Sequence, residues 1–387
     1  MTKPEHSPAA SPAPRLVIIG ECPINLWSLP ADERHRRSFA RAGVSDLPER
    51  TGAILAVRAD YLLGQDLVSA LAARPDTILV SADETVAVAA HVAEGEEQTV
   101  TSLLEAESLD PEPAVPAGCE VLGPDALGSH YDDALRKRAT PVLMSYPDTP
   151  IDTLERATFG AAYKGATDFV TKWLWPRPAR WATRWAAARG LSPNTITTAS
   201  LLLVLLATWM FAEGWFLAAI PVAWAMTFLD TVDGKLARVT VTSSAWGNIY
   251  DHGIDLIHPP FWWWAWYVGA LPLASPAVEP LLLPALWIVI GGYVVGRVFE
   301  GLFVVCFGIE THIWRPLDYF FRTITARRNP NLAILTLATI AGRPDAGLVL
   351  VAGWTVISLL FHLVRLLQAG FWRVRGRPVQ SWLQETT

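Results

Sequence analysis

Four aspartates lie within one 26-residue segment, DTVDGKLARVTVTSSAWGNIYDHGID, at residues 230–255. Asp230 and Asp233 are three residues apart and Asp251 and Asp255 are four apart, so each pair shares one face of a helix. Two adjacent antiparallel helices would bring all four carboxylates to one point, where they repel unless divalent cations bind. Because no His/Cys cluster accompanies them, these oxygen ligands favour Mg²⁺ or Mn²⁺ over zinc. Such a site suits chemistry on phosphate groups.

Small residues and one arginine accompany the aspartates. Gly234, Ala237 and Gly247 leave the room that a flat nucleotide or a close helix crossing needs. The guanidinium group of Arg238 can donate hydrogen bonds to a phosphate oxygen. Taken singly, the small residues are equally well explained by tight helix packing, and Arg238 by anchoring at the positively charged side of a membrane. Their joint spacing with the aspartates favours a binding site.

Together these eight positions resemble the signature of the CDP-alcohol phosphatidyltransferase family, D-x2-D-G-x2-A-R-x8-G-x3-D-x3-D, and every fixed position is met. The resemblance implies that Asp230, Asp233 and Asp251 ligate a pair of divalent cations, with Asp255 completing the acidic centre as the general base. It also implies a membrane-embedded homodimer. Asn194 and Thr197 resemble the family's helix start beside the nucleotide, although Ser192 and Asn194 could equally be helix N-caps.

The expected reaction transfers a phospho-alcohol from a CDP-linked donor to an alcohol or phospho-alcohol acceptor. Asp255 takes the proton of the acceptor hydroxyl, and CMP leaves. The simplest donor is CDP-diacylglycerol, and the alternative is a soluble CDP-alcohol such as CDP-inositol. Arg327, Arg328 and Asn329 could hold an acceptor phosphate, while membrane anchoring explains the two arginines almost as well. We expect His258 to pack at a helix kink and Arg297 to pair with Glu300.

The elements that must position these residues are apolar segments in the second half of the chain. Six of them predict a six-helix membrane domain over residues 193–370, with a short fifth member: 195–212, 216–236, 250–272, 279–307, 330–342 and 346–367. Residues 161–192 are expected to form a linker and an interfacial amphipathic helix, in which Arg177, Arg180 and Arg184 share a face beside Trp181 and Trp185. The basic tail, residues 371–387, and the other Lys/Arg clusters lie on one side of six spans. The positive-inside rule therefore predicts an inner-membrane protein with both termini in the cytoplasm.

The first part of the chain has the opposite character. Residues 1–160 carry 13 Lys and Arg against 25 Asp and Glu, and the later residues carry 18 against 12. This balance, with a net charge of −6, excludes a basic nucleic-acid binder. After a disordered lead-in over residues 1–14, three apolar runs at 15–20, 53–58 and 77–81 alternate with helical patterns at 31–42 and 63–73. They predict a soluble cytoplasmic α/β domain over residues 15–160, with loops and short strands at 94–133.

This α/β region resembles the sugar-nucleotidyltransferase domain fused to the membrane domain in inositol-phosphate cytidylyltransferase/di-myo-inositol-phosphate-phosphate synthase enzymes. The resemblance rests on RLVIIGECP, RAG at 41–43, AILAVRAD ending in Asp60, and ALRKRATP at 134–141. A lone Gly20 before Glu21 replaces the Gly-rich loop that cradles a triphosphate. We therefore expect a degenerate domain that serves docking, dimerisation or regulation, the alternative being an active cytidylyltransferase.

Two other functional classes are alternative interpretations of the sequence. A divalent-cation transporter would also place acidic residues in its spans, but here the aspartates cluster at one face of the membrane. A non-catalytic scaffold would have no need to retain all four aspartates.

Overall fold

The computed structural model describes residues 14–44, 52–109, 115–128, 131–132, 135–138 and 140–384. The lead-in predicted for residues 1–14 lies outside them, apart from Pro14. The chain divides into two compact units, each described by itself below. The first comprises Met1–Asp132, Ala139–Ala162 and Val239–Val241, and the second Asp133–Arg138, Tyr163–Arg238 and Thr242–Thr387.

The first unit is built on a five-stranded mixed sheet with the order β1-β4-β7-β6-β8. β1 pairs in parallel with β4, as β6 does with β8, whereas β7 runs antiparallel to both of its neighbours. The strands are β1 (Arg15–Ile19), β4 (Ile54–Arg58), β6 (Thr77–Val80), β7 (Ala87–Val92) and β8 (Glu120–Leu122). The α/β fold predicted for this region is thus confirmed, and its sheet contains both parallel and antiparallel strand pairs.

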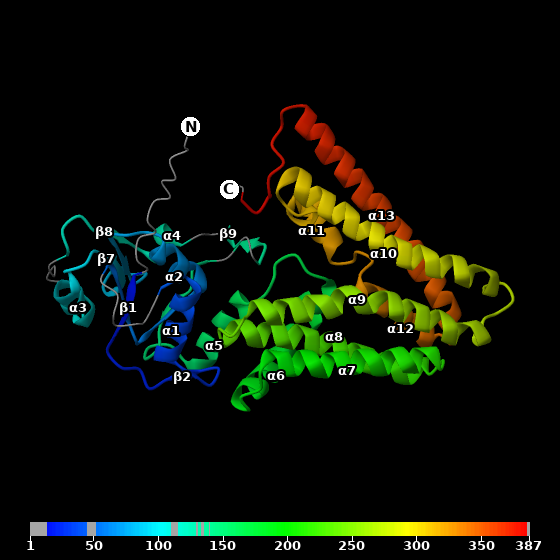
Figure 1. The fold of residues 1–387 in the computed structure, drawn as a ribbon, viewed down its shortest axis with the longest axis horizontal. Helices are drawn as coiled ribbons and strands as arrows, with labels where there is room; N and C mark the ends of the chain where they lie inside the picture. The colour runs from blue at the N-terminus through cyan, green and yellow to red at the C-terminus, as the bar shows by residue number, and fades with distance from the viewer. Residues whose placement is uncertain are drawn as a thin grey trace, which may run out of the picture. The chain divides into compact units, whose positions relative to one another are not determined.

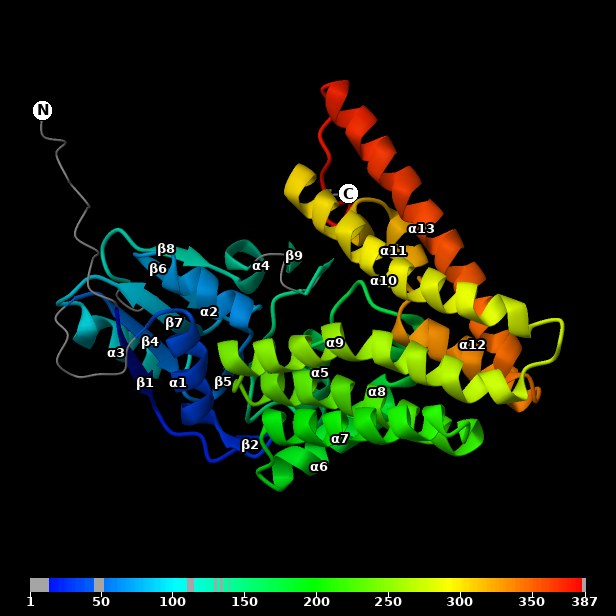
Figure 2. The same ribbon diagram turned by 45° about the vertical axis from the view of Figure 1, so that its right-hand side comes forward.

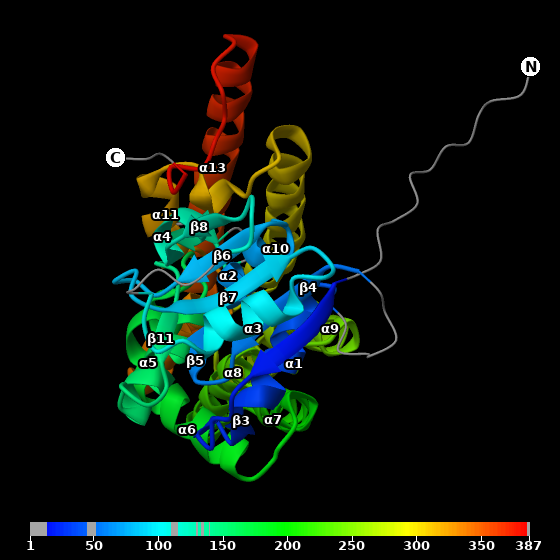
Figure 3. The same ribbon diagram turned by 90° about the vertical axis from the view of Figure 1, so that its left-hand side faces the viewer.

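Helices cover both faces of this sheet (Figure 3). Leu55 and Val57 of β4 pack with Phe39 of α1 (Ala31–Arg41) and Leu71 of α2 (Gln65–Ala72). The alternate residues of the same strand, Ile54 and Ala56, pack with Leu103 of α3 (Glu97–Glu105). Because both faces are covered, the strands read as continuous apolar runs rather than alternating ones.

The predicted runs at 15–20, 53–58 and 77–81 are confirmed as strands, and the helical patterns at 31–42 and 63–73 as helices. The prediction for 94–133 was partly wrong, since α3 lies there, and β7 was not predicted. The smaller elements of this unit are β2 (Asn25–Leu26), β3 (Leu29–Pro30), β5 (Tyr61–Leu63), α4 (Pro124–Leu127), β9 (Tyr131–Asp132), β11 (Leu143–Ser145) and α5 (Ile151–Ala161).

The second unit is helical apart from the short β10 (Lys137–Arg138). Its long helices are α7 (Pro193–Ala212), α8 (Phe216–Val239), α9 (Ala245–Ala270), α10 (Glu279–Phe307) and α13 (Pro344–Val374). α7, α8 and α9 run side by side, and α10 packs along α13 (Figures 1 and 2). The shorter elements are η1 (Val170–Leu174), α6 (Pro176–Ala188), η2 (Leu271–Leu273), η3 (Thr311–Ile313), α11 (Pro316–Arg322) and α12 (Arg328–Ile340).

Among the described residues, four helices are long and apolar enough to cross a membrane: α7, α8, α10 and α13. The other two predicted spans correspond to α9 and α12. α9 is 26 residues long, but its acidic, proline and tryptophan residues make it less apolar. α12 has only 13 residues, about 20 Å of helix, which is shorter than the hydrocarbon core of a bilayer. The helical domain with several apolar helices is therefore confirmed, whereas the count of six spans is not.

A buried aromatic cluster fixes α9 against its neighbours. Trp262 and Trp266 pack on Phe211 of α7, with ring centroids 5.6 and 4.9 Å apart. Their indole N–H groups donate to the carbonyls of Val204 and Pro344 over 3.2 and 2.9 Å. Gly269 permits the closest crossing, since a Cβ there would lie 1.9 Å from the carbonyl oxygen of Phe211. This packing sets the register in which the opposite end of α9 meets α7.

The amphipathic pattern predicted before the first span is present in α6. Ala179, Thr183 and Ala186 are buried, while Trp181 and Trp185 are 70% and 42% exposed. A helix with two outward tryptophans beside arginines suits a bilayer surface.

Candidate active site

Three of the four aspartates converge between the second half of α8 and the first half of α9. Carboxylate oxygens of Asp230, Asp251 and Asp255 all lie within 4.8 Å of one another. Their side chains are 18%, 30% and 42% exposed, so the cluster is reachable from one side. The turn between the helices ends at Ser244, whose Oγ accepts the backbone N–H of Gly247 at 3.0 Å and caps α9.

The fourth aspartate, Asp233, is buried and joined to α7. It is 3% exposed, and its Oδ2 accepts a hydrogen bond from the hydroxyl of Thr197 at 2.6 Å. Its Oδ1 is buried and has no hydrogen-bond partner among the described residues. A buried carboxylate oxygen without a donor is costly unless a cation faces it. Thr197, which the sequence predicted to lie beside the nucleotide, therefore links α7 to the acidic cluster.

The predicted glycines lie where neighbouring side chains approach closely. A Cβ on Gly247 would come within 3.0 Å of Oδ1 of Asn194, and one on Gly234 within 3.1 Å of Nη2 of Arg238. Ala237 is half-buried, and its carbonyl accepts the N–H of Thr242 as α8 ends. Gly247 of α9 thus lies against Asn194 of α7, and Thr197 of α7 contacts Asp233 of α8. The N-cap of α7 is Ser192, whose Oγ accepts the N–H of Thr195, which leaves the exposed Asn194 free of that role.

The three predicted acceptor residues point in different directions. The guanidinium of Arg328 donates to both Asp230 and Asp255 and so acts as their counter-charge. Asn329 is buried, and its Nδ2 donates to Oδ1 of Asp168 at 3.0 Å. Arg327 pairs with Glu300 of α10. The structure therefore does not bring these residues together in one acceptor subsite.

His258 and Arg297 lie as the sequence predicts. His258 is buried, its Nδ1 lies 2.7 Å from the carbonyl of Ile254, and its ring packs edge-on against Trp262 at 5.1 Å. Arg297 Nη1 lies 3.2 Å from Oε2 of Glu300.

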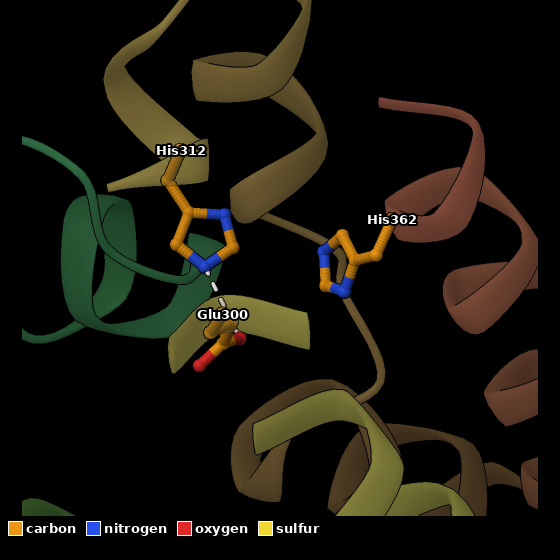
Figure 4. Close-up of side chains that lie close together, drawn as sticks. All are labelled: Glu300, His312 and His362. Atoms are coloured by element: carbon orange, nitrogen blue, oxygen red, sulfur yellow. Dashed lines mark hydrogen bonds and ion pairs between the residues drawn. The ribbon is translucent and has the colours of Figure 1, made fainter. Parts of the chain in front are cut away.

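One cluster was missed by the reading of the sequence. Glu300, His312 and His362 come from α10, η3 and α13, and their ligand atoms lie within 4.8 Å of one another (Figure 4). Nε2 of His312 is 3.3 Å from Oε1 of Glu300, and burial lowers the pKa of His312 to about 3, so this imidazole is neutral. A histidine and a glutamate inside otherwise apolar segments were the available signal, because such residues are costly in a membrane.

Lys164 was also missed. It lies between α5 and η1 in the chain, and its pKa is lowered by burial and by the charges of Arg238 and Arg136. The negative charge of the nearby Asp251 raises the pKa of Lys164 and so offsets part of this lowering. The acidic cluster thus has basic neighbours that suit an anionic ligand.

The residues present fit divalent cations. All four carboxylates are oxygen donors, three of them converge, and the unpartnered Oδ1 of Asp233 offers a further ligand atom. This donor set suits Mg²⁺ or Mn²⁺. The arrangement combines a place for cations, an exposed carboxylate on Asp255 and nearby arginines, which is what phosphoryl-group transfer requires.

Comparison with known proteins agrees with this geometry. Residues 191–326 match the model of the family named CDP-alcohol phosphatidyltransferase. This segment is a CDP-alcohol phosphatidyltransferase domain. It contains α7 to α11 and all four aspartates, and it ends just before Arg327.

A curated relative supports the assignment of this transferase domain. Cholinephosphotransferase 1 from zebrafish (Danio rerio) is 35% identical over 83 residues, covering 18% of this chain and 22% of the relative. The chain thus matches only about a fifth of the relative's length. The family match does not include residues 15–160, so the nucleotidyltransferase resemblance stays a prediction.

Proposed function

We propose that the chain is an integral-membrane CDP-alcohol phosphotransferase of phospholipid biosynthesis. It moves a phospho-alcohol, most simply the phosphatidyl group of CDP-diacylglycerol, onto an acceptor hydroxyl and releases CMP. The observation that carries this proposal is the convergence of Asp230, Asp251 and Asp255 beside Asp233, within the segment that matches the family. A divalent-cation transporter would not require this match to a transferase family.

Asp230, Asp233, Asp251 and Asp255 are proposed to form a two-metal centre for Mg²⁺ or Mn²⁺. Bound cations would neutralise the donor's pyrophosphate and the charge on the leaving group. Thr197 holds Asp233 in place, and Arg238 and Asn194 contact the CDP moiety beside Gly234, Ala237 and Gly247. Arg328 neutralises Asp230 and Asp255 while the cations are absent.

Asp255 is proposed as the general base because it is the most exposed of the four carboxylates. One of its oxygens accepts the proton of the acceptor hydroxyl as that oxygen attacks the β-phosphorus of the donor. A new P–O bond forms, and the bond between the β-phosphorus and the bridging oxygen breaks. CMP leaves with that oxygen and its electron pair.

The membrane setting is part of the proposal. Six spans, with α9 and the short α12 completing the four apolar helices, would place both termini and the aspartates at the cytoplasmic side of the inner membrane. α6 would lie in the interface there, and two copies would form a homodimer. Water-soluble substrates could then reach the site directly.

The first unit is proposed to be a degenerate nucleotidyltransferase-like domain with a docking or regulatory role. The nucleotidyltransferase resemblance puts Asp60 at the position of a metal ligand, but both of its carboxylate oxygens accept hydrogen bonds from Arg58, at 2.7 and 2.9 Å. A carboxylate held in this way by an arginine fork is poorly available to a metal ion.

The donor can be tested with purified full-length protein in detergent with Mg²⁺. CMP release is measured with CDP-diacylglycerol and, separately, with CDP-inositol, each against a panel of neutral and phosphorylated acceptors. CMP with CDP-diacylglycerol alone supports the proposed donor, and CMP with CDP-inositol alone selects the alternative. Release of CMP from neither donor would contradict the proposed function.

A further inference from the structure

A group of arginines gathers where α10 and α13 end. Both helices finish at the same end of their pair (Figures 1 and 2), and the guanidinium of Arg373 donates to the carbonyl of Cys306, which joins the two ends. Arg375 and Arg377 follow directly after α13, and Arg315 directly precedes α11. None of these four arginines takes part in the proposed reaction.

Two of these arginines lie against one tryptophan. The guanidinium carbon of Arg315 is 3.9 Å from the ring centroid of Trp372, and that of Arg377 is 5.5 Å from it. Trp314 packs edge-on against Trp372 with ring centroids 5.6 Å apart, and its own ring centroid is 4.6 Å from the guanidinium carbon of Arg315. Aromatic faces attract such cations. The two positive charges are therefore held close together on one indole.

The segment after α13 has a fixed path. The chain turns at Gly376, whose φ is 70°, and returns to η3. There the hydroxyl of the fully buried Ser381 donates to the carbonyl of Ile313 at 3.0 Å, and the backbone N–H of Trp382 donates to the same carbonyl at 3.2 Å. Arg377 lies between the turn and this contact, so its backbone is held at both ends.

The four arginines lack negative partners, since none of them forms an ion pair with a carboxylate in the described part of the chain. The acidic residues between α10 and α12 are Glu310 and Asp318. The first already pairs with Arg136 and the second with Arg365. Nη2 of Arg315 is buried and has no hydrogen-bond partner among the described residues. Neighbouring positive charges repel, and a buried nitrogen without an acceptor is costly, so an anion with several oxygens would relieve both.

The surroundings of these charges are apolar and exposed. Val374 and Val305, in the last turns of α13 and α10, are 87% and 84% exposed, and Phe371 is 53% exposed. Both helices are long and apolar enough to cross a membrane. Apolar side chains followed by arginines are typical of the boundary between the hydrocarbon core and the headgroups. The anionic oxygens present at this boundary are those of phospholipids.

We propose that Arg315 and Arg377, held on Trp372, form a binding site for the phosphate of an anionic phospholipid headgroup at the membrane surface. This inference rests on the proposed membrane setting and not on the proposed reaction. The site lies at the ends of α10 and α13, whereas the acidic cluster lies between α8 and α9. A basic segment just outside a membrane span attracts anionic lipids in general. The fixed pair of guanidinium groups makes this attraction specific to one position.

Binding is measured on the full-length protein in detergent, without any CDP donor. Dioleoylphosphatidylglycerol is titrated as the anionic probe, and dioleoylphosphatidylcholine is its zwitterionic counterpart. Inorganic phosphate represents the phosphate group without a lipid anchor. Native mass spectrometry counts the bound lipids and gives their affinities. The wild type should bind one phosphatidylglycerol per chain about tenfold more tightly than phosphatidylcholine.

Arg315→Gln and Arg377→Gln should each weaken phosphatidylglycerol binding about fivefold, the usual contribution of one arginine at a membrane surface. Arg377→Gln keeps the inference testable if the other variant misfolds, because Arg377 is exposed. Arg375→Gln is the matched control. It removes the same charge from the same tail, but the guanidinium carbon of Arg375 lies 4.1 Å from the ring centroid of Phe371 instead. Asp233→Asn should leave lipid binding unchanged, which separates this site from the acidic cluster.

Three outcomes would overturn the inference. The first is equal affinity for the two lipids. The second is an equal loss of binding in Arg375→Gln and Arg377→Gln, which would indicate a general attraction of the tail. The third is binding of inorganic phosphate as tight as that of phosphatidylglycerol. If the arginine-dependent lipid binding is found in a wild type that releases no CMP, the proposed function fails while the lipid site stands. If CMP is released without such binding, only this inference fails.

Discussion

The hydroxyl of Thr197 donates to Oδ2 of Asp233 at 2.6 Å, so the first apolar helix holds the most buried carboxylate of the acidic cluster. This bond leaves Oδ1 of Asp233 without a donor among the described residues. The carboxylate is therefore fixed in orientation while one oxygen stays available.

Replacing Thr197 with Val should weaken cation binding without unfolding the protein. The substitution keeps the shape but removes a buried hydrogen bond worth about 1 kcal/mol, which corresponds to roughly a fivefold change. The Mg²⁺ concentration that gives half-maximal CMP release should rise by about that factor. Thr208→Val is the control, because Thr208 lies on the same helix and, among the described residues, its hydroxyl donates only to the carbonyl of Val204. Equal Mg²⁺ curves for Thr197→Val and wild type would contradict this role.

Arg328 should compete with the cations. It donates to Asp230 and Asp255, so it stabilises the cluster when cations are absent. In Arg328→Gln the carboxylates repel one another, and Tm measured in EDTA should fall. Added Mg²⁺ should then raise Tm more in the variant than in the wild type. The same Mg²⁺ response in both proteins would show that the arginine and the cation do not share these carboxylates.

Asp233→Asn and Asp255→Asn should separate two roles. Asp233→Asn removes a proposed ligand and should abolish the stabilisation by Mg²⁺ together with Mg²⁺-dependent CDP binding. Asp255→Asn should retain CDP binding, because its main loss is the proton acceptor. Calorimetry of CDP binding with and without Mg²⁺ measures both effects. Loss of CDP binding in Asp255→Asn alone would reverse the assignment.

The first unit should lose stability in mild acid through His35. Burial and the charge of Arg34 lower the pKa of His35 from 6.5 to about 4 in the folded state. In the unfolded chain His35 is therefore protonated below about pH 6.5, whereas in the folded protein it is protonated only below about pH 4. The stability is full above pH 6.5 and decreases as the pH falls towards 4, by up to about 3 kcal/mol.

Hydrogen exchange of α1 in the full-length protein checks this dependence. Protection, corrected for intrinsic rates, should fall between pH 7 and pH 5 in the wild type. It should change little over that interval in His35→Gln. A fall of the same size in both proteins would assign the pH dependence to another group.

The sequence predicted the acidic cluster well because its residues lie on two consecutive helices. The spacing of Asp230 and Asp233, and of Asp251 and Asp255, is local information that helix geometry converts into a shared face. The helices formed by the long apolar segments were equally predictable, since each forms without contacts to distant parts of the chain. Local patterns were therefore sufficient for the helices and for most of the candidate site.

What the sequence could not predict depends on non-local pairing. Glu300, His312 and His362 come from three elements, and only packing between α10 and α13 brings them together. β7 was missed because its AVAAHV run is rich in alanine, which carries a weak strand signal, and its place between β4 and β6 depends on long-range contacts. The direction of Asn329 towards Asp168 likewise depends on a contact 161 residues away.

CMP release by wild type and Asp255→Asn tests the central claim most directly. Both full-length proteins are assayed in detergent with Mg²⁺, CDP-diacylglycerol and each acceptor of the panel of neutral and phosphorylated alcohols. The proposal predicts CMP from the wild type only when donor and acceptor are both present, and a rate lower by about 10²–10⁴-fold in the variant, the usual contribution of one general base. Equal rates in the two proteins, or no CMP from a wild type that binds no CDP, would contradict it.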